Sequence, residues 1–450
     1  MKISVLPKPV KVQIQLPVAR EEGKFNDPAF AKNKTLPIHR WVPWIAGFSS
    51  DFVRDVFQKN CGKKKCTVLD PFVGVGTTLV EAMLMGHDSI GFEINPYAAL
   101  AARIKAEASS IDHTQALRAI EKLQSFYQNA MSSDNKPKSA PPLGFKTRGI
   151  FYSPAVLKKV LTIQDFIQSE RQNLTTDLLY LAFASTMIQY SNYSYEPSLG
   201  RRSSAGKQDI EDFPVIETII SKLSMILEDI VWLEENKSKR KTKSKVINAS
   251  FFKYKKYLKP DSIDILITSP PYLNNYHYIR NTRPQLYWLG FASKPTDLKS
   301  LEENNFGKYW QTVRENKCVK LNFVLPSSKL GDQLEKLRNI SPEKGIYGGN
   351  GWANYAASYF NDCYRFAQGI HYSLRKGGKA FVVIGNSILQ GDLIPTDHYF
   401  AEIAQKVGLR FCGIDVPRPT RIGNSIIQSR VKNPHKDHQL YEAIIELEKI

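Results

Sequence analysis

The chain has 450 residues, which is too long for one ordinary small domain and predicts one large or two medium domains. Its apolar fraction of 42% and charged fraction of 23% are typical of a soluble globular protein. Lys and Arg number 62 against 43 Asp and Glu, so the formal net charge is +19. Such an excess favours a polyanionic partner such as nucleic acid, although a solvated basic surface has the same composition.

Several classes of protein and site are disfavoured. No run of about 18 apolar residues occurs, so neither a transmembrane helix nor a membrane partner is predicted. Met1–Val10 lacks a secretory core, and the cytoplasm is therefore the expected compartment. The five cysteines are scattered, and only Cys61 and Cys66 are close together. No second Cys or His pair completes them at zinc-finger spacing, so we expect structural thiols and no metal.

The first 35 residues are rich in Lys and Pro and are predicted to form an N-terminal arm, residues 1–35. Two strand–turn–helix units follow in succession, which predicts a parallel sheet with helices packed on it. A glycine ends the first helix, and an Asn-Pro pair opens the second, as helix-end preferences favour. The units are strand Thr67–Asp70, helix Thr77–Met85 before Gly86, strand Ser89–Glu93, and helix Pro96–Glu107 after Asn95.

The α/β pattern then stops and later resumes. Met131–Pro142 is a polar linker, Ser153 precedes further helices that include Leu178–Tyr190 and Val215–Leu233, and Lys237–Lys245 is a basic linker. We therefore predict an α/β domain of residues 36–110 and 241–450, interrupted by a helical insertion at 111–240. Seven mostly parallel strands are expected, the later five being Val246–Asn248, Ile263–Thr268, Ala380–Ile384, Arg410–Ile414 and Ala443–Leu447.

A glycine-containing turn follows the first predicted strand, in the stretch Asp70–Thr78 (DPFVGVGTT). Glycines let the backbone turn tightly and approach a ligand without an intervening side chain. Glu93 ends the next strand, 23 residues after Asp70, which suits an acid that holds the two hydroxyls of a ribose. No Gly-Lys-Ser/Thr closes the turn, and the third glycine of the dinucleotide fingerprint is missing. A ligand with a ribose end and an amino-acid end fits best, and a turn without any ligand is the alternative.

A second motif, Ser269-Pro270-Pro271-Tyr272, follows the apolar strand that ends at Thr268. The two prolines fix the backbone, so that the carbonyls of Ser269 and Pro270 can point into a cleft. Acceptors outside the plane of a base amine would draw its nitrogen toward tetrahedral geometry and free its lone pair to attack a methyl group. Tyr272 offers a face on which an extruded base can stack. Alone, a Pro-Pro turn is only a strand terminator.

Together, DPFVGVGTT, the following GFEINP and the SPPY turn resemble the motifs of DNA amino-methyltransferases that use S-adenosylmethionine. The resemblance covers about half of the chain and implies a Rossmann-like methyltransferase sheet with a helical insertion. Upstream, His39–Trp44 with Phe48 is similar to the segment that closes over the methionine end, with ordinary helix-start packing as the alternative. The resemblance implies that Asp70, Phe72, Gly74 and Gly76 surround the methionine part, that Glu93 holds the ribose, and that Thr77 and Asn95 border the cofactor.

The same resemblance bears on the substrate. In this family a tetrapeptide beginning with Ser is commonest among cytosine-N4 enzymes, and one beginning with Asp among adenine-N6 enzymes. It therefore implies methyl transfer to cytosine N4 of double-stranded DNA by Ser269, Pro270, Pro271 and Tyr272, with a restriction endonuclease as partner. Adenine N6 is the alternative, followed by RNA amine methylation and an inert nucleic-acid-binding relative. Cytosine C5 is disfavoured, because that chemistry needs a thiolate nucleophile and no Cys lies in a Pro-Cys turn.

Some segments have no assigned role in this family pattern. Ala249 and Ser250 stand where relatives have Gly-Asp, so no acid is assigned to an adenine contact, and Asn386 or Ser387 is a candidate border of the pocket. Mixtures of aromatic, polar and basic residues are candidates for stacking on bases and binding phosphates, with polar loops as the alternative. The candidate DNA-contact segments are Asn192–Lys207, Lys237–Lys245, Asn274–Arg283 and Arg418–Arg421.

Overall fold

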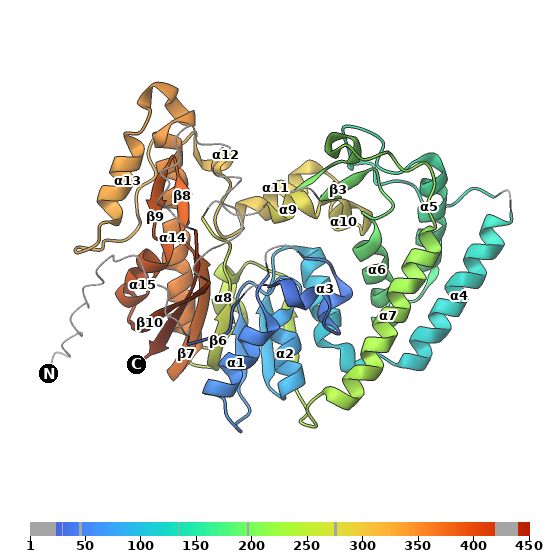
Figure 1. Ribbon diagram of the computed structural model, residues 1–450, viewed down its shortest axis with the longest axis horizontal. Coiled ribbons are helices and arrows are strands. Elements are labelled where there is room, and N and C mark those ends of the chain that lie inside the picture. The colour runs from blue at the N-terminus through green and yellow to red at the C-terminus, as the bar shows by residue number, and fades with distance from the viewer. Residues whose placement is uncertain are drawn as a thin grey trace.

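Seven strands form the central sheet, in the order β10-β11-β7-β6-β1-β2-β5 (Figure 1). The structure is a computed structural model that describes residues 24–28, 30–44, 47–133, 135–195, 198–273, 277–418 and 440–450. β11 runs antiparallel to both of its neighbours, and the other recorded pairs are parallel, which confirms the predicted sheet. The strands are β1 (Thr67–Asp70), β2 (Asp88–Phe92), β5 (Ser244–Ile247), β6 (Ile263–Thr268), β7 (Leu374–Gly385), β10 (Leu409–Arg418) and β11 (Glu442–Lys449).

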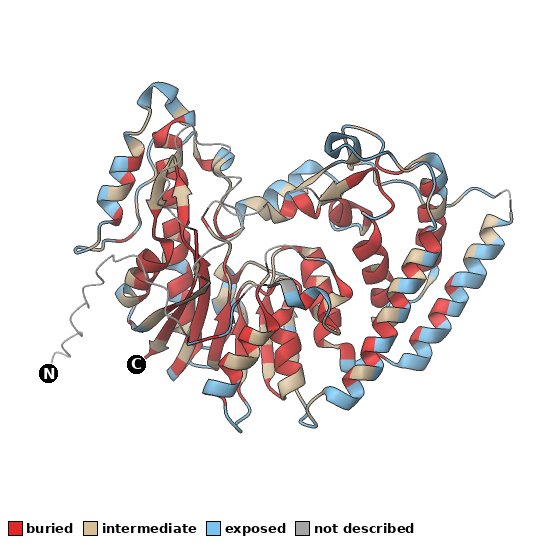
Figure 2. Cartoon of the chain, viewed as in Figure 1, coloured by how far each residue is buried: buried red, intermediate tan, exposed pale blue. Residues whose placement is uncertain are grey.

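Helices cover both faces of this sheet. On one face, α1 (Ser50–Asn60) inserts Phe52 and Val56 into a cluster that contains Ile265 of β6. The other face packs on α14 (Gly349–Ser373) and α15 (Thr396–Lys406), where Phe360 and Phe400 are fully buried. Figure 2 shows the strands buried between these two layers. α2 (Thr77–Met85) and α3 (Pro96–Ala106) follow β1 and β2, as the two predicted units require.

Gly377 and Gly378, which precede the predicted strand Ala380–Ile384, lie within β7. Leu374 pairs with Ile263 of β6, but Lys379 already pairs with Ile265, so the intervening β7 residues bulge out of the ladder. Gly377 has a φ of +72° inside this bulge, a conformation that favours glycine. The strand therefore begins at Leu374, before the bulge and six residues earlier than the predicted Ala380.

A second group of helices stands beside the sheet, built from α4 to α7 (Figure 1). Its apolar faces meet those of α3 in one cluster. α4 is the outermost helix, with its outer surface exposed in Figure 2. Ser153 caps α5 by accepting the amide of Val156, as its sequence position predicts. The group comprises α4 (His113–Met131), α5 (Pro154–Ser169), α6 (Leu174–Thr186), α7 (Val215–Asn236), and the hairpin of β3 (Tyr193–Tyr195) and β4 (Leu199–Arg201).

Short helices connect β6 to α14 and lie above the sheet in Figure 1. They are α9 (Tyr278–Asn281), α10 (Arg283–Trp288), α11 (Pro295–Glu303), α12 (Trp310–Val313) and α13 (Leu330–Arg338), while α8 (Tyr254–Tyr257) precedes β6. A small hairpin of β8 (Ser387–Leu389) and β9 (Asp392–Ile394) follows β7. The 3-10 turns are η1 (Phe30–Lys34), η2 (His39–Trp41), η3 (Ala108–Ser110), η4 (Arg202–Ala205), η5 (Phe251–Lys253) and η6 (Pro342–Tyr347). Among the described residues, no helix is both long and apolar enough to cross a membrane.

The strand order reverses between β1 and β6. β1 pairs with β2 on one side and with β6 on the other, so chain connections leave in opposite directions from this point. In open α/β sheets, such a switch point opens a crevice outside the carboxyl ends of the strands, where ligands bind. The two sequence motifs follow the carboxyl ends of these two neighbouring strands, and the fold therefore brings them together.

Candidate active site

The loop after β1 depends on two glycines. Gly74 has a φ of +52° and Gly76 a φ of +97°, both in the left-handed region. A β-carbon on Gly76 would lie 3.0 Å from the Cα of Ala102, so this residue also permits the close packing of α2 against α3. Gly74 faces a cavity, whereas Gly76 is not among the residues that line it. Gly76 therefore fixes the loop conformation through its packing against α3, outside the cavity lining.

Glu93 connects the loop to the end of β2. Its carboxylate accepts hydrogen bonds from the amides of Gly74, at 2.9 Å, and Asn95, at 2.8 Å. It lines the same cavity as Gly74. Loss of hydration raises its pKa to about 7, although the two amide hydrogen bonds act in the opposite direction. Each carboxylate oxygen accepts from one amide and still has a lone pair for a further hydrogen bond.

Asn95 opens α3, as the sequence predicts. Its side-chain oxygen accepts the amides of Tyr97 and Ala98, which satisfies two donors at the helix start. Its Nδ2 atom donates to Thr282 Oγ1 at 2.7 Å, and this bond links the end of β2 to the segment after the SPPY turn. Asn95 lines the cavity, and so does Thr77 at the start of α2.

Asp70 bridges the two motifs below the cavity. Its Oδ1 atom accepts hydrogen bonds from the Phe72 amide at 3.1 Å and from Thr268 Oγ1 at 2.6 Å. Its Oδ2 atom accepts from Thr78 Oγ1 at 2.6 Å. The side chain is fully buried, which raises its pKa to about 6. Asp70 is absent from the cavity lining and acts on the cavity only through the loop and strand that it joins.

The SPPY turn contributes two of its four residues to the cavity wall, Ser269 and Pro271. The Tyr359 hydroxyl on α14 donates to the Pro271 carbonyl at 3.1 Å and fixes the turn from the side of the core. Pro270 is buried and does not line the cavity. Tyr272 lies outside the lining too, since its hydroxyl meets Ser269 Oγ and Glu442 Oε1, each at 3.4 Å.

The cavity between the motifs has a volume of about 840 Å³ when the space at its mouth is counted. Glu93 and Asn95 share its lining with Ser269 and Pro271 of the SPPY turn. Its other lining residues include the predicted Trp44, Phe48 and Phe72. Residues of segments already singled out in the sequence line it too, namely Phe92, Ala249, Ser250, Tyr278 and Ile279, and so do four that no motif marked: Phe251, Asn304, Asn305 and Phe306.

The segment before α1, residues 39–44 and 47–48, reaches this cavity because contacts with α7 and α2 hold its first part in place. Trp41 Nε1 donates to Asp229 Oδ2 on α7 at 2.9 Å, and His39 Nε2 meets Glu81 Oε1 on α2 at 2.7 Å. These buried contacts hold η2 between the helical group and the sheet. Trp44 and Phe48 then line the cavity, as the resemblance implies, whereas His39 and Trp41 do not.

A second, wider cavity of about 1630 Å³, again with its open space, adjoins the first. The stacked rings of Trp44 and Tyr278, with centroids 6.0 Å apart, line both cavities and form the wall between them. The candidate DNA segment 192–207 lines the second cavity with the three residues of β3, with Arg202 of η4 and with Lys207. Basic residues in the lining are Lys34, Arg40, Arg202, Lys207 and Lys222, and aromatic ones are Tyr97, Tyr193 and Tyr195.

The other candidate DNA segments have different positions. Lys237–Lys245 is an exposed connection whose end enters β5. In the segment 274–283, Tyr278 and Ile279 line the first cavity, while residues 274–276 lie outside the described residues. Arg418 ends β10, and residues 419–421 lie outside the described residues as well. Asn386 Oδ1 accepts the Tyr441 amide and Ser387 Oγ donates to the Leu273 carbonyl, so both support the scaffold.

The comparisons with known proteins agree with this geometry. A family model described as DNA methylase, N6_N4_Mtase, matches residues 53–103, which include the loop Asp70–Thr78 and Glu93. The chain is 23% identical over 420 residues to Type II methyltransferase M.BsoBI of Geobacillus stearothermophilus, covering 85% of this chain and 80% of the relative. It is 25% identical over 427 residues to Type II methyltransferase M.AvaI of Nostoc sp., covering 88% and 84%.

These matches support kinship with the DNA amino-methyltransferase family. A shorter match, 26% identical over 161 residues, is to Type II methyltransferase M.MjaII of Methanocaldococcus jannaschii, covering 35% of this chain and 30% of the relative. A DNA amino-methyltransferase requires a methyl donor site and an amine site in one cleft, and the first cavity of this chain joins the residues predicted for both.

Proposed function

We propose that this DNA methyltransferase transfers a methyl group from S-adenosylmethionine to the exocyclic N4 amine of cytosine in double-stranded DNA. The main support for this proposal is that Glu93, Ser269 and Pro271 line the same cavity. The 2.6 Å bond between Thr268 and Asp70 supports it, because this bond ties the two motif-bearing strands together at their carboxyl ends. The Type II names of the relatives support a role beside a restriction endonuclease. The proposed place of action is the cytoplasm.

The residues around the cavity fit S-adenosylmethionine. Glu93 supplies oxygens for the ribose hydroxyls, and Phe92, Phe251 and Trp44 supply apolar walls for a planar base and a carbon chain. The positive φ of Gly74 exposes loop backbone beside Glu93 with no side chain between. The bound cofactor supplies an electrophilic methyl group on a sulfonium.

The SPPY turn binds and orients the amine. The Tyr359 hydroxyl holds the Pro271 carbonyl, so the turn is fixed before substrate arrives. Acceptors on the Ser269 side chain and on the turn backbone take the two amine hydrogens and aim the nitrogen lone pair along the cavity. Ser269 is a poor base, and the surplus proton therefore leaves to water after transfer. Tyr272 accepts a hydrogen bond from Ser269 Oγ at 3.4 Å and steadies that side chain from outside the cavity lining.

The second cavity is the proposed entrance for DNA. Its basic side chains attract phosphates, and its tyrosines offer faces on which bases stack. The Trp44–Tyr278 wall separates this entrance from the methyl-donor site, so a base rotated out of the duplex passes beside that wall. This arrangement is the proposed role of the β3–β4 hairpin within the 111–240 insertion.

The test is to incubate the protein with methyl-labelled cofactor and unmodified double-stranded DNA, digest the DNA, and identify the labelled nucleoside by mass. N4-methylcytosine is the expected product. N6-methyladenine would move the proposal to the second candidate, adenine N6, and label in RNA but not in DNA would overturn it. Tyr359→Phe, which keeps the ring and removes the hydroxyl that holds Pro271, should slow turnover and leave cofactor binding unchanged.

A further inference from the structure

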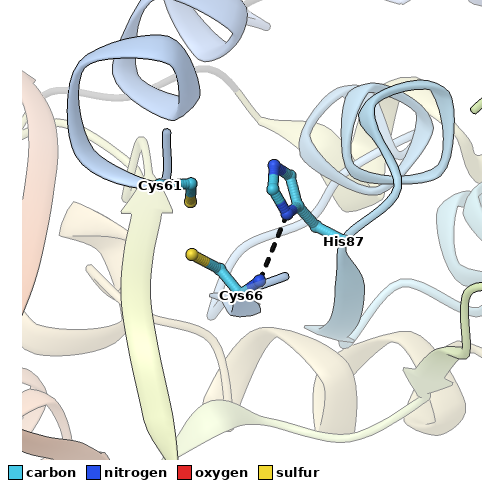
Figure 3. A group of neighbouring side chains, drawn as sticks. All are labelled: Cys61, Cys66 and His87. Carbon is cyan, nitrogen blue, oxygen red and sulfur yellow. Dashed lines mark hydrogen bonds between the residues drawn. The ribbon is translucent and has the colours of Figure 1, made fainter. Parts of the chain in front are cut away.

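Two thiols and an imidazole meet at the opposite end of the sheet from the cavity. The candidate ligand atoms of Cys61, Cys66 and His87 all lie within 4.8 Å of one another, and all three residues are buried. Figure 3 shows the two sulfur atoms and the ring turned toward the same small space. The sequence did not predict this meeting, because His87 follows Cys66 by 21 residues and forms no local pair with it.

Three different elements deliver these side chains. Cys61 is the C-cap of α1, Cys66 directly precedes β1, and His87 directly precedes β2. Because β1 and β2 are parallel neighbours, residues just before them lie side by side at the amino edge of the sheet. β1 is 4 residues long, so this edge is roughly 13 Å from the loop at its other end.

The backbone already holds the three residues in place. The Cys61 amide donates to the Phe57 carbonyl at 2.8 Å, and the His87 amide donates to the Ala82 carbonyl at 2.8 Å. The Cys66 carbonyl accepts the Asp88 amide at 3.0 Å. The His87 ring also packs against the Phe57 ring, with centroids 4.9 Å apart. A ligand entering this space would therefore meet a set of donors whose main chains are fixed before binding.

We propose that Cys61, Cys66 and His87 bind one zinc ion at the amino edge of the sheet. Two thiolates and one neutral imidazole are a preferred ligand set for Zn²⁺, with sulfur about 2.3 Å and nitrogen about 2.0 Å from the metal. A water molecule completes the tetrahedron. The thiols lose two protons on binding, so the ion and its ligands carry no net charge, which suits a buried site.

His87 Nδ1 is the nitrogen assigned to the metal. It accepts the Cys66 amide at 3.2 Å, so its lone pair faces the cysteine side and the ring proton is on Nε2. Zinc replaces this long hydrogen bond and leaves Nε2–H free to donate. Nearby, Asp264 has both oxygens engaged, with the Thr67 amide at 2.6 Å and Arg375 Nε at 2.7 Å, and it stays outside the ligand set.

The proposed zinc site has a structural role and takes no part in methyl transfer. It ties the end of α1 to the starts of β1 and β2, and the cofactor loop and Glu93 follow the other ends of those two strands. A disulfide between Cys61 and Cys66 would use the same sulfur atoms and is the competing state. Because the proposed site takes no part in methyl transfer, zinc binding is measured directly and not through the methyltransferase activity.

The experiment uses the full chain, reduced, stripped of metal and titrated with Co²⁺ and Zn²⁺. One equivalent of Co²⁺ should give sulfur-to-cobalt charge-transfer absorption, which one equivalent of Zn²⁺ then removes. Cys66→Ser should weaken binding by at least about 100-fold, more than the loss of an outer partner costs. Cys412→Ser, at an exposed thiol on β10, should bind as the wild type does.

A second measurement keeps the test independent of how the variants fold. In the wild type, zinc should protect Cys61 and Cys66 from alkylation, and a chelator should remove that protection, as read from peptide masses. No saturable cobalt absorption, or equal absorption in Cys66→Ser, would overturn the proposal. It would also fail if the two thiols resist alkylation until a reductant is added, because that outcome identifies a disulfide.

Discussion

The pH dependence of cofactor binding offers a sharp test of the role assigned to Glu93. Burial raises its pKa to about 7 from an ordinary value of 4.5, so the cofactor-free protein holds this group partly protonated near neutral pH. Ribose hydroxyls donate hydrogen bonds and need the ionised carboxylate as acceptor. Affinity for S-adenosylmethionine should therefore fall as the pH drops through 7.

The size of the effect follows from the pKa. Between pH 8 and pH 6 the ionised fraction of a group with a pKa of about 7 falls about tenfold, which corresponds to about 1.4 kcal/mol of binding free energy. Glu93→Gln keeps the shape but removes the charge. Hydrogen bonds to charged groups contribute about 1.5–3 kcal/mol, so the variant should bind about 10- to 150-fold more weakly at pH 8.

Isothermal titration calorimetry of both proteins from pH 5.5 to 8.5 measures this. The cofactor has titrating groups of its own, and the variant serves as the control because it shares them. The predicted result is a wild-type profile that rises through pH 7 relative to a flatter variant profile. Parallel profiles for the two proteins would refute the assignment of Glu93 as the ribose acceptor.

Three further perturbations test the scaffold and the DNA entrance. Gly76→Ala forces a side chain into a φ of +97° and against Ala102 at 3.0 Å, so urea unfolding should show a loss of about 1–3 kcal/mol. Thr268→Val removes one hydrogen bond to the buried Asp70 carboxylate and should cost about 1–3 kcal/mol. Because the pKa of Asp70 is about 6, this loss should be largest above pH 6, where the group is ionised, and should shrink below it. Lys34→Ala should weaken DNA binding and reduce the salt slope by about 1, whereas Lys122→Ala on the exposed α4 should change neither.

Local signals in the sequence predicted much of the fold. Thr77–Met85 is helical to the residue, because Gly86 ends it with a φ of +82°. Asn95 and Ser153 open their helices with the expected side-chain caps. These features depend on residues within one helical turn of each other, so the local spacing of residues in the sequence is enough to predict them. The strand after the Gly-Gly pair begins earlier than predicted, because pairing with β6 continues across a bulge.

The candidate site could be predicted only in part. Glu93, Gly74 and Ser269 belong to motifs placed by strand ends, and all three line the cavity. The direction of a side chain after a strand depends on tertiary partners, which is why Tyr272 lies toward Glu442 and outside the lining. Asn304–Phe306 comes from a connection without periodic pattern, and no local signal marked it.

The most direct measurement is a crystal structure of the protein with S-adenosylhomocysteine. We expect the ribose hydroxyls to donate hydrogen bonds to the Glu93 carboxylate and the sulfur atom to face Ser269 and Pro271 across the first cavity. A ligand seated in the second cavity, beyond the Trp44–Tyr278 wall, or one whose sulfur points away from Pro271, would contradict it.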